Sequence, residues 1–268
     1  MKFEKWQALG NDYLIVTEPV DAETVRALCD RHTGVGADGV LLLQPPDEPG
    51  FVARLRIFNP DGSEAELSGN GAREAIMYLH RRGWTDAKQF SIQTVAGEIR
   101  PTILDERTCR VDMGRARLGA TGEVHGFAFQ QVFVGNPQCA IRVETVDELE
   151  HLDLQAIGPG IEHHALFAPD RTNVSWWTEL EPGVIRARIF ERGVGETMSS
   201  GTGASGAAIA HVLRGGDSPV TVKLDGGELE VDVGEDLHVD LTGWAVPVFQ
   251  GEVEPDQIAS QSAGRPAR

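Results

Sequence analysis

The chain has 268 residues, of which 41% are hydrophobic, and its formal net charge is −17. This length suits two domains of ordinary size, and the apolar content excludes a chain that is disordered throughout. The acidic balance argues against a nucleic-acid-binding protein and against binding to anionic membranes, because contacts with phosphates need a basic surface.

The first segment of the chain, MKFEKWQALGNDYLIV, carries charges and a glycine where a signal peptide needs an apolar stretch. No apolar run in the sequence reaches the 18 residues that a transmembrane helix requires. We therefore expect a cytoplasmic protein. The next element is a helix, predicted over Asp21–Arg31.

Cysteines and lysines limit the chemistry that a cofactor or metal could supply. The three cysteines have no metal-type spacing, so we expect buried, reduced thiols and no metal site. They are Cys29, Cys109 and Cys139. A Schiff-base cofactor such as pyridoxal phosphate needs a dedicated lysine, and none of the four lysines lies in a glycine-rich, motif-like context. We expect no cofactor.

An internal repeat is the strongest pattern in the sequence. Residues 53–76 align without gaps on residues 185–208, and ten of these 24 positions are identical. Weaker matches extend this alignment on both sides in the same order, from LGND at 9–12 with VGNP at 134–137 to AGEI at 96–99 with GGEL at 226–229. We interpret the chain as the product of a duplication.

Each half is predicted to contain the same series of elements. An arginine-bearing strand, Arg54–Phe58 or Arg186–Phe190, alternates polar and apolar residues and is therefore expected to be half buried. After a polar loop comes a helix that begins near Ala72 or Ala204 and ends in Arg-Gly, a typical C-terminal cap. The second helix is apolar on all sides and is expected to be buried. Short strands separated by glycine-containing turns close each half.

The two helices begin with matching sequences, Ser-Gly-Asn-Gly-Ala from Ser68 and Ser-Gly-Thr-Gly-Ala from Ser200. Glycines let a ligand approach the backbone, and the first turn of a helix presents unpaired N–H groups, so such a start suits a carboxylate or phosphate. Serine at this position is also an ordinary N-cap. Because the start occurs twice in a duplicated fold, we expect both loops to face one cleft and to hold one ligand. The spacing G-x-G-x-x-G at Gly201–Gly206 does not indicate a dinucleotide site, since the preceding strand ends too early.

The sequence resembles the diaminopimelate epimerase family over nearly its whole length, from Gly10 to about Gly251. The motifs that carry the resemblance are GNDYLIV, GADGVLLL, RIFNPDGSEAELSGNGAREA, VGNPQCA, TNVSW, RIFERGVGET and SSGTGASGAA. The resemblance implies an α+β fold of two pseudo-symmetric duplicated domains, each a mixed β-sheet or barrel wrapped around a central α-helix. It also implies cofactor-independent epimerisation of LL- to meso-diaminopimelate, a step in lysine and cell-wall precursor synthesis, with the substrate in the interdomain cleft.

The resemblance implies a role for several residues. Two acid–base groups flank the α-carbon in that family, and their positions correspond to Ser68 and Ser200. Gly69-Asn70 and Gly201-Thr202 are expected to hold the α-carboxylate, and Glu191 and Arg192 to lie beside the reacting centre and the distal groups. The remaining polar groups of the substrate are assigned to four asparagines: Asn11, Asn59, Asn136 and Asn173.

The sequence departs from the family at its reactive positions. Serine stands at 68 and 200 where the family has its two catalytic cysteines, and Gln138 stands where it has a histidine. A serine hydroxyl needs an adjacent base to act, and Glu191 is the remaining candidate for that base. Three explanations stay open: engineered serines, a natural enzyme in which serine and Glu191 share the proton chemistry, and a diverged protein that binds an amino acid or performs one-base chemistry.

The predicted domain limits are 1–115 for the N-terminal repeat and 116–247 for the C-terminal repeat. Residues 248–268 are expected to form a final strand that returns toward the N-terminal domain, followed by a loose tail from about Gln257. The expected partner is a small amino-acid substrate. A homodimer is compatible with the sequence, which does not fix the oligomeric state.

Overall fold

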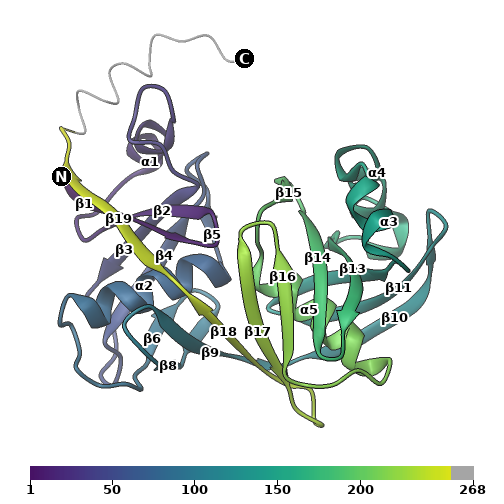
Figure 1. The fold of residues 1–268 in the computed structure, drawn as a ribbon. Coiled ribbons are helices and arrows are strands. Elements are labelled where there is room, and N and C mark those ends of the chain that lie inside the picture. Colours follow the sequence, from purple (N-terminus) through teal and green to yellow (C-terminus); the bar gives the residue numbers. More distant parts are fainter. Residues whose placement is uncertain (255–268) are drawn as a thin grey trace. The chain divides into compact units, whose positions relative to one another are not determined.

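A computed structural model describes residues 1–254, and the predicted tail from Gln257 lies outside this part of the chain. Contacts within the chain separate two units, shown in Figure 1. The first unit contains Met1–Cys109 and the described residues from Trp244 onward, and the second contains Arg110–Gly243. The domain limits predicted from the sequence, residues 115 and 247, lie a few residues after the observed limits at Cys109 and Gly243.

The first unit is built on one mixed sheet with the strand order β19-β1-β2-β3-β4-β6-β7, and β5 pairs with β4. β19 adds to the edge strand β1 in the antiparallel direction. The strands of this sheet are β1 (Lys2–Ala8), β2 (Asn11–Val16), β3 (Gly39–Gln44), β4 (Ala53–Phe58), β5 (Glu64–Ala65), β6 (Ile92–Thr94), β7 (Gly97–Ile99) and β19 (Val246–Glu252). Its other elements are α1 (Ala22–Cys29), α2 (Gly69–Arg81) and β8 (Pro101–Ile103).

The two helices of the first unit bury different sets of strand residues. α1 begins where the sequence predicts it, because Asp21 accepts a hydrogen bond from the backbone N–H of Thr24 at 2.8 Å. Its Val25 and Leu28 pack into a cluster with Val40 and other residues of β2 and β3. α2 contacts β1, β2 and β3. On β3 its Gly71 lies near Leu41, whereas α1 packs on the alternate residues Val40 and Leu42. Strand β3 is therefore covered on both sides, which explains its continuous apolar sequence.

The second unit repeats this plan. Its strands follow the order β10-β11-β12-β13-β14-β16-β17-β18-β9, and β15 pairs with β14. The strands are β9 (Thr108–Arg115), β10 (Arg117–Val124), β11 (Phe127–Val134), β12 (Asn136–Arg142), β13 (Asn173–Glu181), β14 (Val184–Glu191), β15 (Gly195–Thr197), β16 (Val220–Leu224), β17 (Gly227–Val233) and β18 (His238–Trp244). The helices are α3 (Val146–His151), α4 (Leu154–Glu162), the 3-10 helix η1 (Ala165–Phe167) and α5 (Gly201–Leu213).

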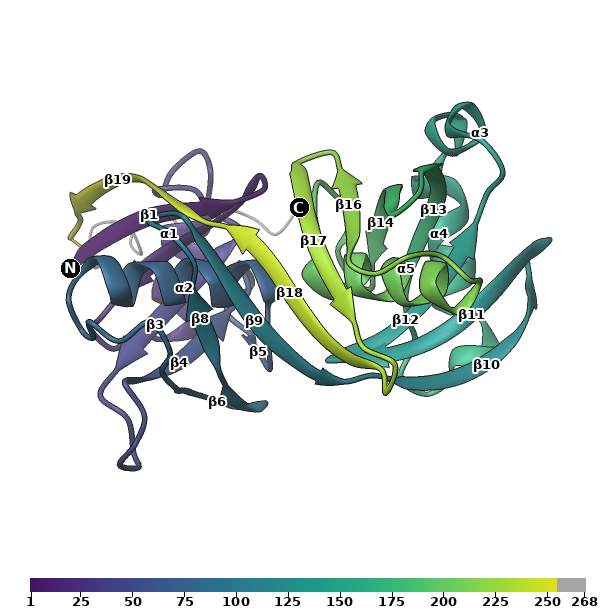
Figure 2. The same cartoon turned by 60° about the horizontal axis from the view of Figure 1, so that its bottom comes forward.

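Helix α5 is the centre of the second unit. It contacts β11, β12, β13, β14, β16 and β17, and Figure 2 shows it alongside these strands. Residues Gly201–His211 are all buried, which confirms the prediction of a helix surrounded by protein. Both central helices also end as predicted, since Gly83 after α2 and Gly215 after α5 have φ values of 69° and 91°. Glycine adopts this left-handed conformation after a helix without strain.

The strand pairings confirm the duplication. β2–β3 and β12–β13 are parallel, β3–β4 and β13–β14 are antiparallel, and β4–β6 and β14–β16 are again parallel. The register is also repeated: Phe58 pairs with Val40 and Glu64, as Phe190 pairs with Val174 and Glu196. The pairings thus match residue by residue at the strands that precede each central helix.

Three smaller findings complete the fold. The three cysteines are free and buried, as the sequence predicts. Within residues 1–254, no helix is both long and apolar enough to cross a membrane. Helices α3 and α4 were not predicted; they occupy the connection between β12 and β13, where the first unit has α1 between β2 and β3. The Thr145-x-x-Glu148 spacing of a capping box marks the start of α3 and could have revealed it.

Candidate active site

Ser68 and Ser200 cap the two central helices. The Ser68 hydroxyl oxygen accepts a hydrogen bond from the Gly71 backbone N–H at 3.1 Å, and that of Ser200 accepts one from Gly203 at 3.3 Å. Both serines have the extended backbone typical of an N-cap. The ordinary capping role of these serines is therefore confirmed. Each hydroxyl has a second partner as well, and this partner differs between the units.

In the first unit, the second partner of Ser68 is Tyr13. The phenol hydroxyl of Tyr13, on β2, donates to the Ser68 hydroxyl oxygen at 3.3 Å. The tyrosine is buried and Ser68 is partly buried. Sequence reasoning did not single out Tyr13, since a tyrosine in an apolar strand is usually part of the core. Only the pairing of β2 with its neighbours brings its hydroxyl group to the helix start.

A chain of hydrogen bonds fixes the first turn of α2. The fully buried guanidinium of Arg73 donates to the carbonyl oxygen of Gly69 at 3.0 Å and to the side-chain oxygen of Asn70 at 2.6 Å. Asn70 donates to the side-chain oxygen of Asn11 at 3.2 Å, and Asn11 donates to Asp38 at 2.8 Å. Two predicted binding residues, Asn11 and Asn70, are thus in contact, beside a buried positive charge that favours an anion at this helix start.

Asn59 lies in a turn of the first unit. Its backbone N–H donates to the carbonyl oxygen of Ser63 at 2.9 Å, and its side chain donates to the Ser63 hydroxyl at 3.0 Å. These bonds close the connection from β4 to β5. Asn59 occupies the register position that Glu191 occupies in the second unit, directly after Phe58 and Phe190 respectively.

In the second unit, the second partner of Ser200 is a carboxylate. The Ser200 hydroxyl donates to Glu191 Oε2 at 3.1 Å, and the Thr197 hydroxyl donates to Glu191 Oε1 at 2.9 Å. Burial raises the pKa of the Glu191 carboxyl, and the two hydroxyl hydrogen bonds oppose this shift only in part. A carboxylate with a raised pKa is a stronger base than an ordinary surface glutamate, which suits proton transfer near neutral pH.

Three further predicted residues of the second unit, Asn136, Asn173 and Arg192, also form a connected group. Asn173 donates to the side-chain oxygen of Asn136 at 3.1 Å and accepts from the backbone N–H of Arg192 at 2.9 Å. The Arg192 guanidinium donates to the carbonyl oxygen of Asp170, and Gln138 donates to Asn136. Asn173 therefore connects β13 to the turn after β14, immediately next to Glu191.

Comparison with known proteins assigns the family. A family model described as diaminopimelate epimerase matches residues 3–119 and 131–248. The diaminopimelate epimerase of Pelotomaculum thermopropionicum is 42% identical to this chain, over 94% of this chain and 98% of that protein. The chain belongs to the diaminopimelate epimerase family. A second relative of the same name, from Moorella thermoacetica, is 39% identical over 96% of this chain and all of that protein.

Solved structures show that this diaminopimelate epimerase family member shares its fold with more distant proteins. A putative phenazine biosynthesis protein from Clostridium difficile is similar with a TM-score of 0.74 at 13% identity, over 95% of this chain and 99% of that chain. A hydroxyproline epimerase from Agrobacterium vitis is similar with a TM-score of 0.68 at 16% identity, over 94% of this chain and 91% of that chain. At these identities the likeness extends to the fold, which is the two-domain duplicated fold that the sequence predicts.

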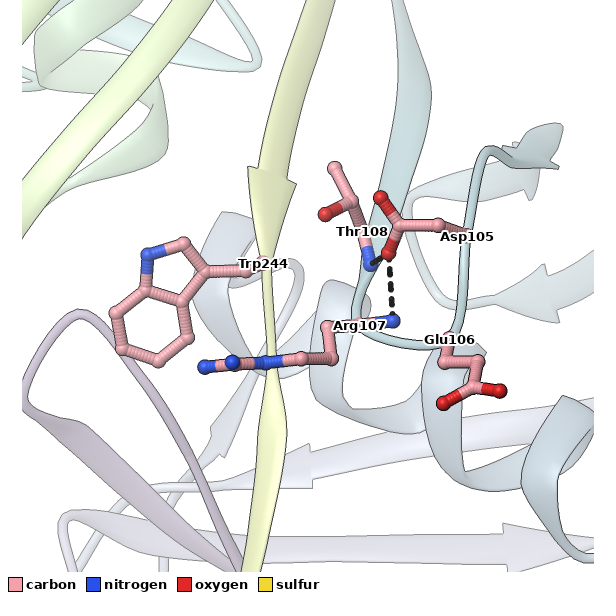
Figure 3. A pocket seen from close by; sticks show the side chains of 5 residues that line it. All are labelled: Asp105, Glu106, Arg107, Thr108 and Trp244. Carbon is pink, nitrogen blue, oxygen red and sulfur yellow. Dashed lines mark hydrogen bonds between the residues drawn. The ribbon is translucent and has the colours of Figure 1, made fainter.

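Two further features of this family member lie outside the predicted site. A pocket of about 580 Å³ in the first unit is lined by the turn Asp105–Thr108 and by Trp244, and Figure 3 shows the Arg107 side chain extending toward the indole. In the second unit, Asp112, His238 and Asp240 bring their potential ligand atoms within 4.8 Å of one another. Nε2 of His238 lies 3.1 Å from Oδ1 of Asp112 there. None of the predicted site residues contributes to either feature.

Glu74, on α2, is a buried carboxyl that sequence reasoning did not identify. The residue is fully buried, and within the described chain neither of its carboxyl oxygens accepts a hydrogen bond of good geometry. Burial raises the pKa of Glu74 well above its usual value of 4.5. The charge of Arg73 and the nearby backbone N–H of Tyr13 oppose the effect of burial only in part. The side chain is therefore held in its protonated form over a pH range in which an exposed glutamate is ionised.

We expect Glu74→Gln to stabilise the protein increasingly as the pH rises above 4.5. Below that pH both the folded and unfolded states keep the proton, so no difference arises from it. At higher pH the unfolded chain releases the proton and the folded chain retains it, which removes about 1.4 kcal/mol of parent stability per pH unit until the folded group also ionises. Urea denaturation of both proteins between pH 5 and 8 measures the effect. Glu48→Gln, at an exposed loop position, is the control, and a pH-independent difference for Glu74→Gln would contradict the prediction.

Proposed function

We propose that this protein epimerises LL-diaminopimelate to the meso form without a cofactor, by removing the α-proton from one face and returning a proton to the other. Family membership makes the chain an isomerase of the amino-acid epimerase class. One observation carries the assignment to this particular chain: the Ser200 hydroxyl, at the start of α5, donates to the partly desolvated carboxylate of Glu191.

The substrate's α-carboxylate is assigned to the starts of the two central helices. We propose that Gly69-Asn70 and Gly201-Thr202 bind it through backbone N–H groups, since the dipole of each helix adds partial positive charge there. The buried guanidinium of Arg73 supports this role at the first helix. The other polar groups of the substrate are assigned to side chains that the motifs name: Asn11, Asn59, Asn136, Asn173 and Arg192.

The proton-removing group of the proposed reaction is the pair of Ser200 and Glu191. As the bond between the α-carbon and its hydrogen breaks, the proton passes to the Ser200 oxygen while the serine's own proton passes to Glu191. The α-carbon keeps the electron pair. This transfer needs no free serine alkoxide, which would not persist near pH 7. Ser68 is assigned to the opposite face, where it protonates the carbanion.

The test is an exchange experiment in deuterated water. LL-diaminopimelate is incubated with the protein, and NMR and chiral chromatography follow deuterium at the α-carbon and the appearance of the meso form. We expect one deuterium in each molecule that inverts. No exchange above a buffer blank contradicts the proposal, and exchange without inversion assigns one-base chemistry instead. A panel of other amino acids tests the substrate class.

A further inference from the structure

The two serines differ in the direction of their hydrogen bonds. A serine hydroxyl has one proton to donate and two lone pairs that accept. Ser68 accepts from the Gly71 N–H, and of the two hydroxyls that face each other at 3.3 Å the phenol of Tyr13 is the stronger acid and therefore the better donor. With Tyr13 as donor, both lone pairs of Ser68 are used and its proton is what remains for a ligand. Ser200 accepts from the Gly203 N–H and donates its proton to Glu191, so a lone pair is what remains. Ser68 is thus arranged to give a proton, and Ser200 to take one.

Comparison of the two units shows why a tyrosine fits at position 13. In the paired strands Tyr13 lies opposite Gly39, and the matching pair of the second unit is Gln138 and Asn173. A Cβ atom at Gly39 would lie 2.5 Å from Cε1 of the Tyr13 ring, so the missing side chain leaves the space that the ring fills. The ring in this place brings its hydroxyl group to Ser68. The phenol is therefore particular to the first unit.

We propose that Tyr13 supplies the returned proton through Ser68, so that the first unit carries the acid of the reaction and the second unit the base. This inference rests on the proposed epimerase function. Tyr13 acts through Ser68 and is a positioning and relay residue, while Ser68 contacts the reacting carbon.

The proton transfer balances as follows. The carbanion's electron pair forms a new bond with the Ser68 hydroxyl proton as that O–H bond breaks. The Tyr13 O–H bond breaks in turn, its proton restores the serine hydroxyl, and the negative charge rests on the phenolate. A phenol has a pKa of about 10, far below that of an alcohol, so the charge is better placed on tyrosine than on serine. Solvent then reprotonates the phenolate and removes the proton held by Glu191.

Tyr13→Phe tests this inference because it keeps the ring and removes only the hydroxyl group. Tyr78→Phe is the matched control: Tyr78 is the other tyrosine of the chain, lies on α2 of the same unit and packs edge-on against Trp6. Three readouts are needed: the rate of inversion, the rate of α-deuterium exchange for both epimers in deuterated water, and the melting temperature.

We expect Tyr13→Phe to slow inversion by about 100-fold or more, the usual contribution of an acid–base group. Exchange of the epimer whose α-proton faces Ser200 should stay within about threefold of the parent, because that step uses Glu191. Tyr78→Phe should match the parent in all three readouts.

Inversion by Tyr13→Phe at the rate of Tyr78→Phe overturns the inference. So does an equal loss of inversion and exchange together with a lower melting temperature, since that pattern indicates a structural role. A parent protein that neither exchanges nor inverts rejects the epimerase function itself. The failure of Tyr13 alone, with an active parent, leaves the proposed function standing.

Discussion

Replacing Glu191 with glutamine should lower kcat for epimerisation by about 10²- to 10⁴-fold, the range that a positioned acid–base group contributes. Glutamine keeps the size of the side chain, but its single amide oxygen can accept only one of the two hydrogen bonds from Ser200 and Thr197, and it cannot accept the substrate's proton. The measurement is the initial rate of meso-diaminopimelate formation over a range of pH.

The pH dependence follows from the direction of the pKa shift. Burial raises the pKa of Glu191 above 4.5, so the parent should lose activity as the pH falls through that raised value and the base becomes protonated. The glutamine variant should lack this acidic limb. At neutral pH it should also be at least as stable as the parent, because ionising a desolvated carboxyl disfavours the folded state.

A control variant separates the base from its hairpin. Glu196 lies opposite Phe190 on the same hairpin and pairs with the Arg188 guanidinium at 2.6 Å. Glu196→Gln removes this largely buried ion pair and should lower stability by about 1–3 kcal/mol, with little change in kcat. Equal activity of the parent and Glu191→Gln would remove Glu191 from the mechanism.

Replacing Gly39 with alanine should lower both stability and activity. The added Cβ would lie 2.5 Å from Cε1 of Tyr13 and even closer to the carbonyl oxygen of Phe58, so either the strand or the ring must move. Overpacking of this kind costs about 1–3 kcal/mol of unfolding free energy. Because displacement of the ring also moves its hydroxyl away from Ser68, we expect kcat to fall by about tenfold or more, toward the value for Tyr13→Phe.

Denaturant titrations and initial rates measure the two effects of Gly39→Ala. Gly122→Ala is the control, since it adds the same methyl group at an exposed position on β10, where the nearest atom is 3.3 Å away on the Phe129 ring. That substitution should change stability by no more than about 0.5 kcal/mol. If Gly39→Ala behaves in the same way, the close packing of Tyr13 on Gly39 does not govern the site.

The sequence predicts the parts of this molecule that recur. The strands Arg54–Phe58 and Arg186–Phe190, the two central helices and their Arg-Gly ends all lie where the repeat places them, because local patterns define each of them. The two helices begin three residues earlier than Ala72 and Ala204, since Ser68 and Ser200 serve as their caps.

What the sequence does not reveal is the partner of each buried polar group. Tyr13 lies two residues after Asn11 in an apolar strand, and nothing in that strand indicates that its hydroxyl group reaches a serine 55 positions away. Glu74 lies in an otherwise regular helix, and its burial depends on strands that pack around it. The proximity of Glu191 to Ser200 was expected from motifs, and the hydrogen bond between them gives that expectation a geometry.

Glycine positions show how the two halves diverged after duplication. In the first unit the large Tyr13 is accompanied by Gly39, and in the second Gln138 lies against Gly206, where a Cβ would approach within 2.9 Å. By the repeat, Gly206 corresponds to Glu74 and Gly39 to Asn173. A large side chain in one half is therefore compensated by a glycine in the same half, and side-chain volumes differ between corresponding positions of the two halves. A single residue copied from one half to the other should misfit, whereas the compensating residues copied together should fit, so these positions are expected to evolve as linked sets.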